Sequence, residues 1–228
     1  MKWFTQLFSS TLGYKVLMAL TGLFLISFLA VHLAGNLQLV KNDGGKAFNI
    51  YAEFMSTNPI IQTISKLNFT FIIIHVIWAI ILSRKNRTAR GPESYAVTSG
   101  KSSHWTSRNM GILGTIILVF LVIHLKDFWG QMHYGGIATM NYDGHEARNI
   151  YLVVSGWFHT GWYVALYVFC MWAVGFHLWH GFASAFQTLG VNHLKYNGLI
   201  AFVGRAFAIV VPALFALIPV MMYFELTF

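Results

Sequence analysis

The chain has 228 residues, of which 57% are hydrophobic and only 10% are charged. Because charged residues make up about a quarter of an ordinary soluble domain, this composition excludes a soluble globular protein and favours one helical membrane domain over residues 1–228. The formal net charge of +8 does not indicate a nucleic-acid surface, since the basic residues lie mostly between apolar segments, where membrane topology explains them.

Five apolar segments are long enough to cross about 30 Å of hydrocarbon at about 1.5 Å per residue. The second follows Asn58 and Pro59, a capping residue and a proline suited to the first helical turn. The fifth contains Pro212 and Pro219, which should kink it. The predicted spans cover about residues 15–38, 60–83, 109–130, 157–187 and 199–224. We therefore expect an all-α membrane protein with five transmembrane helices.

The loops between these spans alternate in charge. One loop, residues 84–108, carries several bases against a single acid, Glu93. The positive-inside rule places such a loop in the cytoplasm. The N-terminus is then expected in the cytoplasm and the C-terminus outside, with residues 39–59 and 131–156 in external loops.

The one cysteine of the sequence, Cys170, lies within an apolar segment. A disulfide within the chain is therefore impossible, and the Cys-x-x-Cys patterns of zinc, iron–sulfur and covalent haem sites are absent. Any haem bound by this chain would be held without a covalent link. The first residues lack the cleavage site of a signal peptide, so the first apolar segment is expected to be retained.

Four histidines lie inside four different predicted spans: His32, His75, His124 and His177. An ionisable side chain in hydrocarbon is costly and usually persists because it binds or conducts something. Counted from the cytoplasmic helix ends at about 1.5 Å per residue, His32 and His124 both lie roughly 25 Å deep. His75 lies roughly 14 Å deep, and His177 belongs to the same inner half. The four histidines thus form an outer pair and an inner pair.

Two layers of paired histidines predict two haems within the bundle of the first four spans. A haem iron accepts one imidazole on each face, and facing helices of a bundle can supply both. An iron with two axial histidines has no open position, so it carries electrons rather than binding oxygen. Packing histidines placed independently would rarely give two depth-matched pairs. A single metal centre would need ligands that converge on one point.

Several residues near these histidines are weaker candidates for haem contacts. His180 lies one helical turn after His177 and could face the same haem. Gly181, four residues after His177, would leave room for the porphyrin. Lys15 and Arg108 could neutralise haem propionates at the inner interface, although both also fit plain positive-inside anchors.

Carboxylates are nearly absent from the predicted spans, so no proton relay through buried acids is expected. On the outer side, Glu53, Asp127 and Tyr151 are candidates for proton uptake. Ordinary surface chemistry is the favoured interpretation of each of these three residues.

With these residues in place, the chain resembles, over nearly its whole length, the five-helix di-haem cytochrome b subunits of succinate:quinone oxidoreductases and fumarate reductases. The Thr-Gly-Leu-Phe sequence at 21–24 followed by His32 looks like the first ligand helix of that family. His75, nine residues before Arg84, looks like the second ligand, and His124, late in the third span, matches the third.

The fourth ligand helix of the family carries a histidine with glycines four and thirteen residues later. His177, Gly181 and Gly190 meet this pattern, which favours His177 over His180. The resemblance thus implies that His32, His75, His124 and His177 ligate the iron of two b haems.

The resemblance also implies a function: a single transmembrane cytochrome b domain that anchors an enzyme in the bacterial inner membrane and transfers electrons. A flavoprotein subunit would oxidise succinate or reduce fumarate, and an iron–sulfur subunit would relay electrons, both on the cytoplasmic face. The inner haem would face the iron–sulfur subunit, and the outer haem would face quinone, for which menaquinone is the family's usual di-haem choice. The chain has no flavin fingerprint and no dicarboxylate clamp of its own.

Two other functions remain open at this point. The chain could be the cytochrome b anchor of another quinone-linked dehydrogenase or of a hydrogenase, with the same haems and different soluble partners. It could also be a haem-free anchor or transporter. Five spans without two symmetric halves argue against transport.

Overall fold

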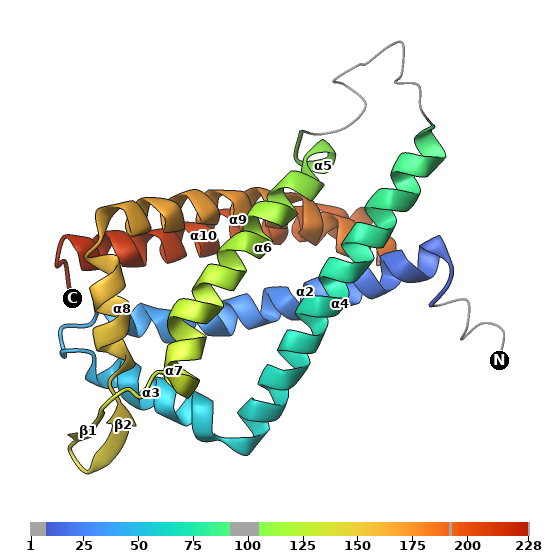
Figure 1. Ribbon diagram of the computed structural model, residues 1–228. Coiled ribbons are helices and arrows are strands. Elements are labelled where there is room, and N and C mark those ends of the chain that lie inside the picture. Colours follow the sequence, from blue (N-terminus) through green and yellow to red (C-terminus); the bar gives the residue numbers. More distant parts are fainter. Residues whose placement is uncertain (1–7, 92–104, 192, 228) are drawn as a thin grey trace.

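The structure, a computed structural model, describes residues 8–91, 105–191 and 193–227. These residues are mostly helical, and they contain five helical segments long and apolar enough to cross a membrane (Figure 1). The five segments are α2 (Thr11–Asn36) with η1 (Leu37–Val40), α4 (Pro59–Arg90), α6 (Met110–His124) with η2 (Leu125–Gly130) and α7 (Gln131–Tyr134), α9 (Gly161–Thr188) and α10 (Leu194–Tyr223). The predicted number of spans and the multi-pass membrane class are thereby confirmed.

The predicted helix starts are set by local hydrogen bonds. Asn58 accepts hydrogen bonds from the backbone amides of Ile60 and Ile61, at 3.0 and 3.3 Å, and Pro59 is the first residue of α4. The hydroxyl of Ser10 likewise accepts from the amide of Gly13 at 3.0 Å and caps α2. Such caps satisfy amides that have no partner within the helix.

The predicted fourth span, residues 157–187, begins at the wrong place. The chain forms two helices there, α8 (Ile150–Phe158) and α9, separated by His159 and Thr160. Thr160 is extended, and its carbonyl accepts from the amides of Tyr163 and Val164 to start the new helix. The apolar residues at 157 and 158 therefore belong to a short separate helix, and the span starts at Gly161.

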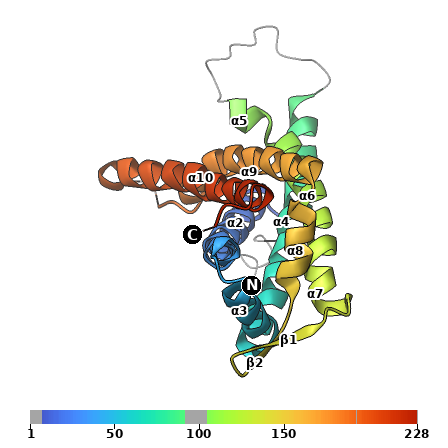
Figure 2. The same cartoon turned by 90° about the vertical axis from the view of Figure 1, so that its left-hand side faces the viewer.

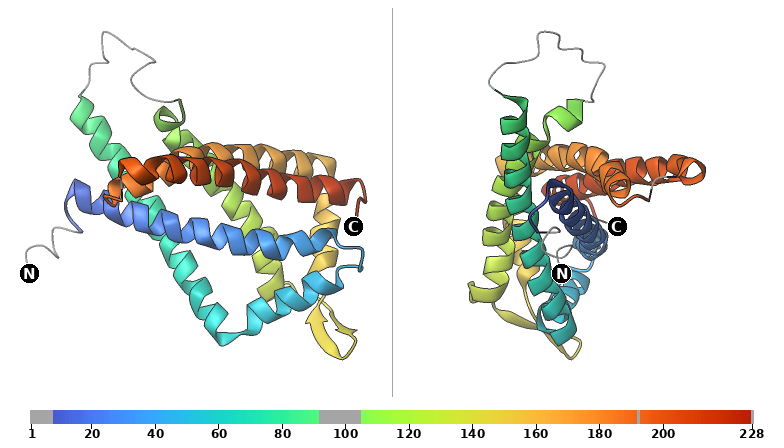
Figure 3. Two further views of the ribbon diagram at one scale, coloured as in Figure 1. Left: turned by 180° about the vertical axis from the view of Figure 1, so that it is seen from behind. Right: turned by 90° about the vertical axis from the view of Figure 1, so that its right-hand side faces the viewer.

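The long helices form two groups. α2, α9 and α10 lie roughly along one another, and α4 and α6 cross them on one side (Figures 1 and 3). The α9 helix packs against α10, α2 and α6, so it is the central element of the bundle. The largest buried apolar cluster lies where α9 meets α8, α6 and the end of α10, and it includes Phe158, Tyr163 and Tyr167. Pro212 and Pro219 lie buried inside α10, which stays helical through both.

The connections at one end of the bundle fold into a compact layer, here called the cap and defined as residues 37–57 and 131–158. It contains η1, α3 (Lys46–Thr57), α7, α8 and a hairpin of β1 (Thr139–Tyr142) and β2 (His145–Arg148). Figure 2 shows α3, α7 and the hairpin in the lower part of the view, with α8 above them. The antiparallel strands pair Tyr142 with His145 across Asp143 and Gly144, which both have positive φ, as a tight hairpin turn requires.

A buried asparagine ties the cap together. Asn49 of α3 is fully buried, and its amide nitrogen donates to the Tyr142 hydroxyl at 2.7 Å and to the Asn149 side chain at 2.9 Å. Its side-chain oxygen accepts from the backbone amide of Tyr151 at 2.8 Å. One side chain thus joins α3, the hairpin and α8, because a buried amide must use its donors and acceptor. The predicted basic loop, residues 84–108, is at the opposite end of the bundle. Most of it lies outside the described residues, but its last four residues form the short helix α5 (Trp105–Arg108).

Candidate functional site

The four span histidines come together as two pairs. The rings of His32 on α2 and His124 on α6 have centroids 5.7 Å apart. The rings of His75 on α4 and His177 on α9 have centroids 6.3 Å apart. These are the pairs that depth counting predicts. We call His32 with His124 the cap pair, because both helices lead from it into the cap, and His75 with His177 the far pair.

Aromatic rings enclose the cap pair. Phe28 stacks on His32 with ring centroids 5.2 Å apart, and Phe215 of α10 approaches the same imidazole at 5.5 Å. Phe120 lies one turn before His124, at 5.6 Å between centroids. A dry, apolar wall of this kind keeps water away from a bound group and holds the imidazoles in place.

The far pair is held differently. The hydroxyl of Thr21 lies 3.1 Å from Nδ1 of His75, and it donates to the carbonyls of Leu17 and Met18. With that proton on a carbonyl, the Thr21 oxygen is an acceptor for Nδ1 of His75 in the Nδ1-protonated tautomer, in which Nε2 carries the free electron pair. Nδ1 of His177 is buried and has no hydrogen-bond partner among the described residues. A buried ring nitrogen without a partner is uncommon in a folded protein.

The two pairs fit haem iron by their spacing. A metal held about 2 Å from a nitrogen of each of two imidazoles separates their ring centroids by about 6 Å, and both measured separations agree with this. A Cβ atom added to Gly181 would meet no atom within 4 Å, so there is open space on α9 beside the far pair. Among the described residues, no three His, Cys, Asp or Glu side chains gather as a metal site. Two separate two-ligand sites are what this arrangement offers.

The other predicted haem contacts lie further out. Lys15 is exposed on the first turns of α2, and Arg108 is exposed at the end of α5, both at the end of the bundle opposite the cap. His180 is half-buried one turn after His177 on α9. The ring of His177 faces that of His75.

Asp127 is not a surface residue, contrary to the favoured interpretation of the sequence. It lies in the π-helical turn η2 directly after α6, and it is only 5% exposed. The hydroxyl of Tyr163 donates to its carboxylate at 2.9 Å, and Tyr163 and Tyr167 are joined at 3.4 Å between hydroxyls. The Tyr167 hydroxyl lies 3.1 Å from Nδ1 of His124. The interpretation of Asp127 as ordinary surface chemistry is therefore wrong.

Glu53 also differs from a free surface acid. Arg148 binds both of its carboxylate oxygens, at 2.8 and 3.0 Å. The same guanidinium donates to the Met132 carbonyl at 2.6 Å and to the Ser56 hydroxyl at 2.8 Å. The hydrogen bonds from Arg148 hold the pKa of Glu53 below its usual range, against the opposing effect of burial. This ion pair binds α3 to the hairpin and to α7.

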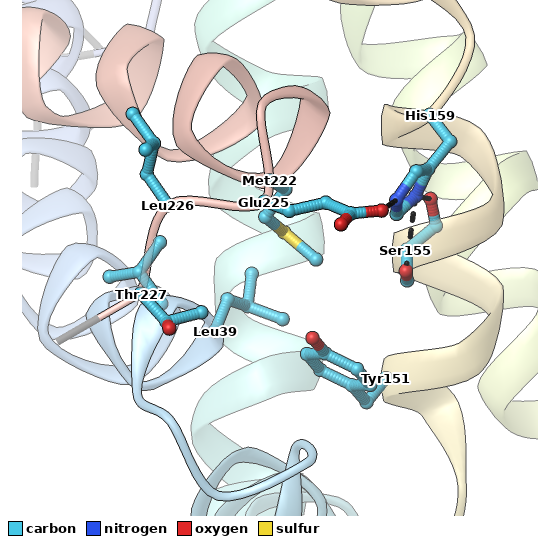
Figure 4. Close-up of a pocket in the computed structure, with 9 residues that line it drawn as sticks. Leu39, Tyr151, Ser155, His159, Met222, Glu225, Leu226 and Thr227 are labelled. Carbon is cyan, nitrogen blue, oxygen red and sulfur yellow. Dashed lines mark hydrogen bonds and ion pairs between the residues drawn. The ribbon is translucent and has the colours of Figure 1, made fainter.

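A cavity of about 200 Å³ opens between the cap and the end of α10 (Figure 4). Tyr151, the third outer candidate, lines it. Nε2 of His159 lies 3.6 Å from a carboxylate oxygen of Glu225, and Nδ1 lies 2.7 Å from the Ser155 carbonyl. The remaining wall is mostly apolar. The lining residues are Leu39, Val40, Tyr151, Ser155, His159, Met222, Glu225, Leu226 and Thr227.

Comparisons with models of protein families, with curated proteins and with solved structures find no match for this chain. What the chain does must therefore be inferred from its own residues, and above all from the two histidine pairs.

Proposed function

We propose that this chain is the di-haem cytochrome b subunit of a succinate:quinone oxidoreductase, which anchors the enzyme in the bacterial inner membrane and transfers electrons between an iron–sulfur subunit and menaquinone. The observation that carries the proposal is the pairing of four intramembrane histidines at two levels of one bundle. Four ionisable side chains in apolar spans need a ligand to justify their placement. The resemblance to the di-haem anchor family supplies the particular enzyme.

In this proposal His32 and His124 hold one b haem, and His75 and His177 hold the other. When bound, each haem would supply one-electron transfer, because two histidines of this chain would hold its iron and leave no position for oxygen. The chain orients the imidazoles through Thr21 and Tyr167 and excludes water with the aromatic rings around the cap pair. The dicarboxylate chemistry belongs to a partner flavoprotein subunit.

Haem content tests this proposal directly. A pyridine haemochrome assay on the purified chain should give about two b haems per polypeptide, one for each histidine pair. The spectrum of the reduced protein should be that of six-coordinate, low-spin haem. A well-folded preparation that contains no haem would exclude electron transfer by this chain and leave a structural anchor or transporter.

The soluble partners separate the proposed enzyme from other quinone-linked cytochromes. A native complex that carries covalent flavin and interconverts succinate and fumarate supports the proposal. A complex that carries nickel or molybdenum instead would make this chain the anchor of a hydrogenase or formate dehydrogenase.

The cap cavity is the site that we propose for the quinone ring. Leu39 lies seven residues after His32 and Met222 lies seven residues after Phe215, so both chain segments place the cavity about 10 Å beyond the cap pair. Its volume of about 200 Å³ is below the about 300–1,000 Å³ of pockets for drug-sized ligands. It suits a ring system whose isoprenoid tail stays in the lipid.

His159 and Glu225 give this cavity groups that hold and move a proton. Nε2 of His159 lies at the cavity wall toward the Glu225 carboxylate. In exchange for that contact, it would donate its proton to a carbonyl oxygen of a bound ring (Figure 4).

Replacing His159 with asparagine should raise the KM for a soluble menaquinol analogue about tenfold, which corresponds to one lost hydrogen bond of about 1.4 kcal/mol. Haem content should stay unchanged, because His159 lies outside both histidine pairs. His133→Asn is the matched control, since His133 is an exposed cap histidine that does not line the cavity. If both variants have the same KM as the wild type, the quinone does not bind in this cavity.

The proposed orientation places the cap outside the cell and the ends of α4 and α5 in the cytoplasm, where the soluble subunits would dock. A cysteine introduced at Asn141, exposed on β1, should react with a membrane-impermeant maleimide added to intact cells. One introduced at Asn86, exposed near the end of α4, should not react. The buried native Cys170 adds no background. The reverse labelling pattern would invert the topology.

A further inference from the structure

A hydrogen-bonded chain of side chains runs from His124 to a buried carboxylate. It passes from Nδ1 of His124 to the hydroxyl of Tyr167 at 3.1 Å, to the hydroxyl of Tyr163 at 3.4 Å, and to Asp127 at 2.9 Å. Tyr163, Tyr167 and Asp127 are 1%, 5% and 5% exposed. The chain is thus dry along its length, where each hydrogen bond is stronger than in water.

The direction of every bond in this chain follows from the carboxylate. The Tyr163 hydroxyl donates to a carboxylate oxygen of Asp127, so its single proton is committed to that bond. For the two tyrosine hydroxyls at 3.4 Å to be hydrogen-bonded, Tyr163 must then accept the proton of Tyr167. With its own proton committed, Tyr167 can only accept from His124. His124 is therefore protonated on Nδ1, and its Nε2 carries the free electron pair that a metal needs.

Two local features build this arrangement. Tyr163 and Tyr167 are four residues apart on α9, so their hydroxyls lie on one face of the helix. The polypeptide backbone forms the π-helix η2 directly after His124. Such a wider π turn is often found at functional sites. The ammonium of Lys126, whose side chain is 80% exposed, lies 3.3 Å from the Asp127 carboxylate.

The far pair has no equivalent. Nδ1 of His75 meets the neutral hydroxyl of Thr21, and Nδ1 of His177 has no partner among the described residues. The two pairs therefore differ in the hydrogen-bond partners of their Nδ1 atoms, although each consists of two histidines in an apolar bundle.

We propose that Asp127 is a positioning residue for His124, acting through Tyr163 and Tyr167 to fix the tautomer of that imidazole and to increase its electron donation through Nε2. The proposal rests on the proposed function for the identity of the metal, which is haem iron. Hydrogen bonds from a ligand histidine to a carboxylate raise the basicity of the ligand. A more basic His124 favours oxidised iron. The hydrogen-bonded chain therefore lowers the reduction potential of the cap-pair haem relative to the far-pair haem.

Redox titration of three variants tests the proposal. Asp127→Asn keeps an acceptor for Tyr163 and removes the charge, Tyr163→Phe cuts the chain in the middle, and Tyr167→Phe removes the partner of His124. Each should raise the potential of the cap-pair haem and leave the far-pair haem unchanged. If the preference of the site for oxidised over reduced iron falls tenfold, the potential rises by about 59 mV.

The double variant Asp127→Asn with Tyr163→Phe gives the sharpest result. If Asp127 acts through the tyrosines, the double variant shifts the potential no more than Tyr163→Phe alone, because the path is already broken. Shifts that add, or an Asp127→Asn variant with the wild-type potential, would overturn the proposal. Thr21→Val is the control, since it should alter only the far-pair haem.

Nitrogen-15 NMR of histidine-labelled protein supplies a second readout that needs no haem. His124 should show the Nδ1-protonated tautomer in the wild type, and Tyr167→Phe should convert it to a mixture of tautomers. If the wild-type protein folds but binds no haem and still shows this tautomer, the proposed function is contradicted and the hydrogen-bonded chain is supported. If His124 of the haem-free wild type is protonated on Nε2, the proposed direction of the hydrogen bonds from His124 to Asp127 is wrong.

Discussion

Replacing His177 with alanine should reduce the haem content from about two to about one per polypeptide, because it removes one axial bond of the far pair and leaves the cap pair intact. His177 is the α9 residue whose ring faces His75. The remaining haem should keep the potential and the spectrum of the cap-pair haem. A pyridine haemochrome assay and a redox titration of the same preparation measure both quantities.

His180→Ala is the matched control, since it removes a histidine one turn away on the same helix. Both haems should remain. Any change should be a shift in potential, as expected for a residue in the surroundings of a ligand rather than a ligand. Loss of a haem in His180→Ala together with two haems in His177→Ala would show that the far pair was assigned to the wrong residue of α9.

The features that could be predicted from the sequence depend on local regularities. The five spans follow from apolar length, and the pairing of His32 with His124 follows from the constant rise of a helix, which turns residue counts into depths. Helical rise says nothing about rotation, so the counts could not show which histidine of α9 faces α4. The resemblance to a di-haem family supplied that choice.

The features that escaped prediction depend on breaks in regularity. Asp127 lies near the end of a predicted span, where acids are usually exposed, and the π-helical turn that accompanies its burial has no sequence signal that we know. The break before Gly161 is hidden because apolar residues occur on both sides of it. The hairpin, by contrast, could have been found, because Asp143 and Gly144 form a typical two-residue turn.

One ion pair joins three elements of the cap. Arg148 joins Glu53 of α3 to the carbonyl of Met132 and to Ser56. Both charged side chains are about three-quarters buried, with 26% and 23% exposed. Removing one partner leaves the other charge poorly solvated, and breaking a fully buried pair costs about 3–5 kcal/mol.

We expect Arg148→Ala to destabilise the cap by about 2–3 kcal/mol, less than for a fully buried pair because water still reaches both groups. Cleavage by a protease within residues 135–149 should become much faster, and the haem content should stay near two because no histidine of either pair lies in the cap. Lys46→Ala is the control. It breaks the other ion pair between α3 and the hairpin, that of Lys46 with the fully exposed Asp143, and it should change cleavage little.

The same ion pair makes the cap sensitive to acid. The pKa of Glu53 is lowered by Arg148 in the folded protein, so the pair stabilises the cap at pH values above the ordinary pKa of a glutamate, which is about 4.3. This stabilisation is lost as the pH falls through the lowered pKa of the folded state. Hydrogen exchange of the amides in residues 46–57 should therefore show a drop in protection below about pH 4 in the wild type. Arg148→Ala should already lack that protection at neutral pH, and an acid transition of equal size in both proteins would assign it to another group.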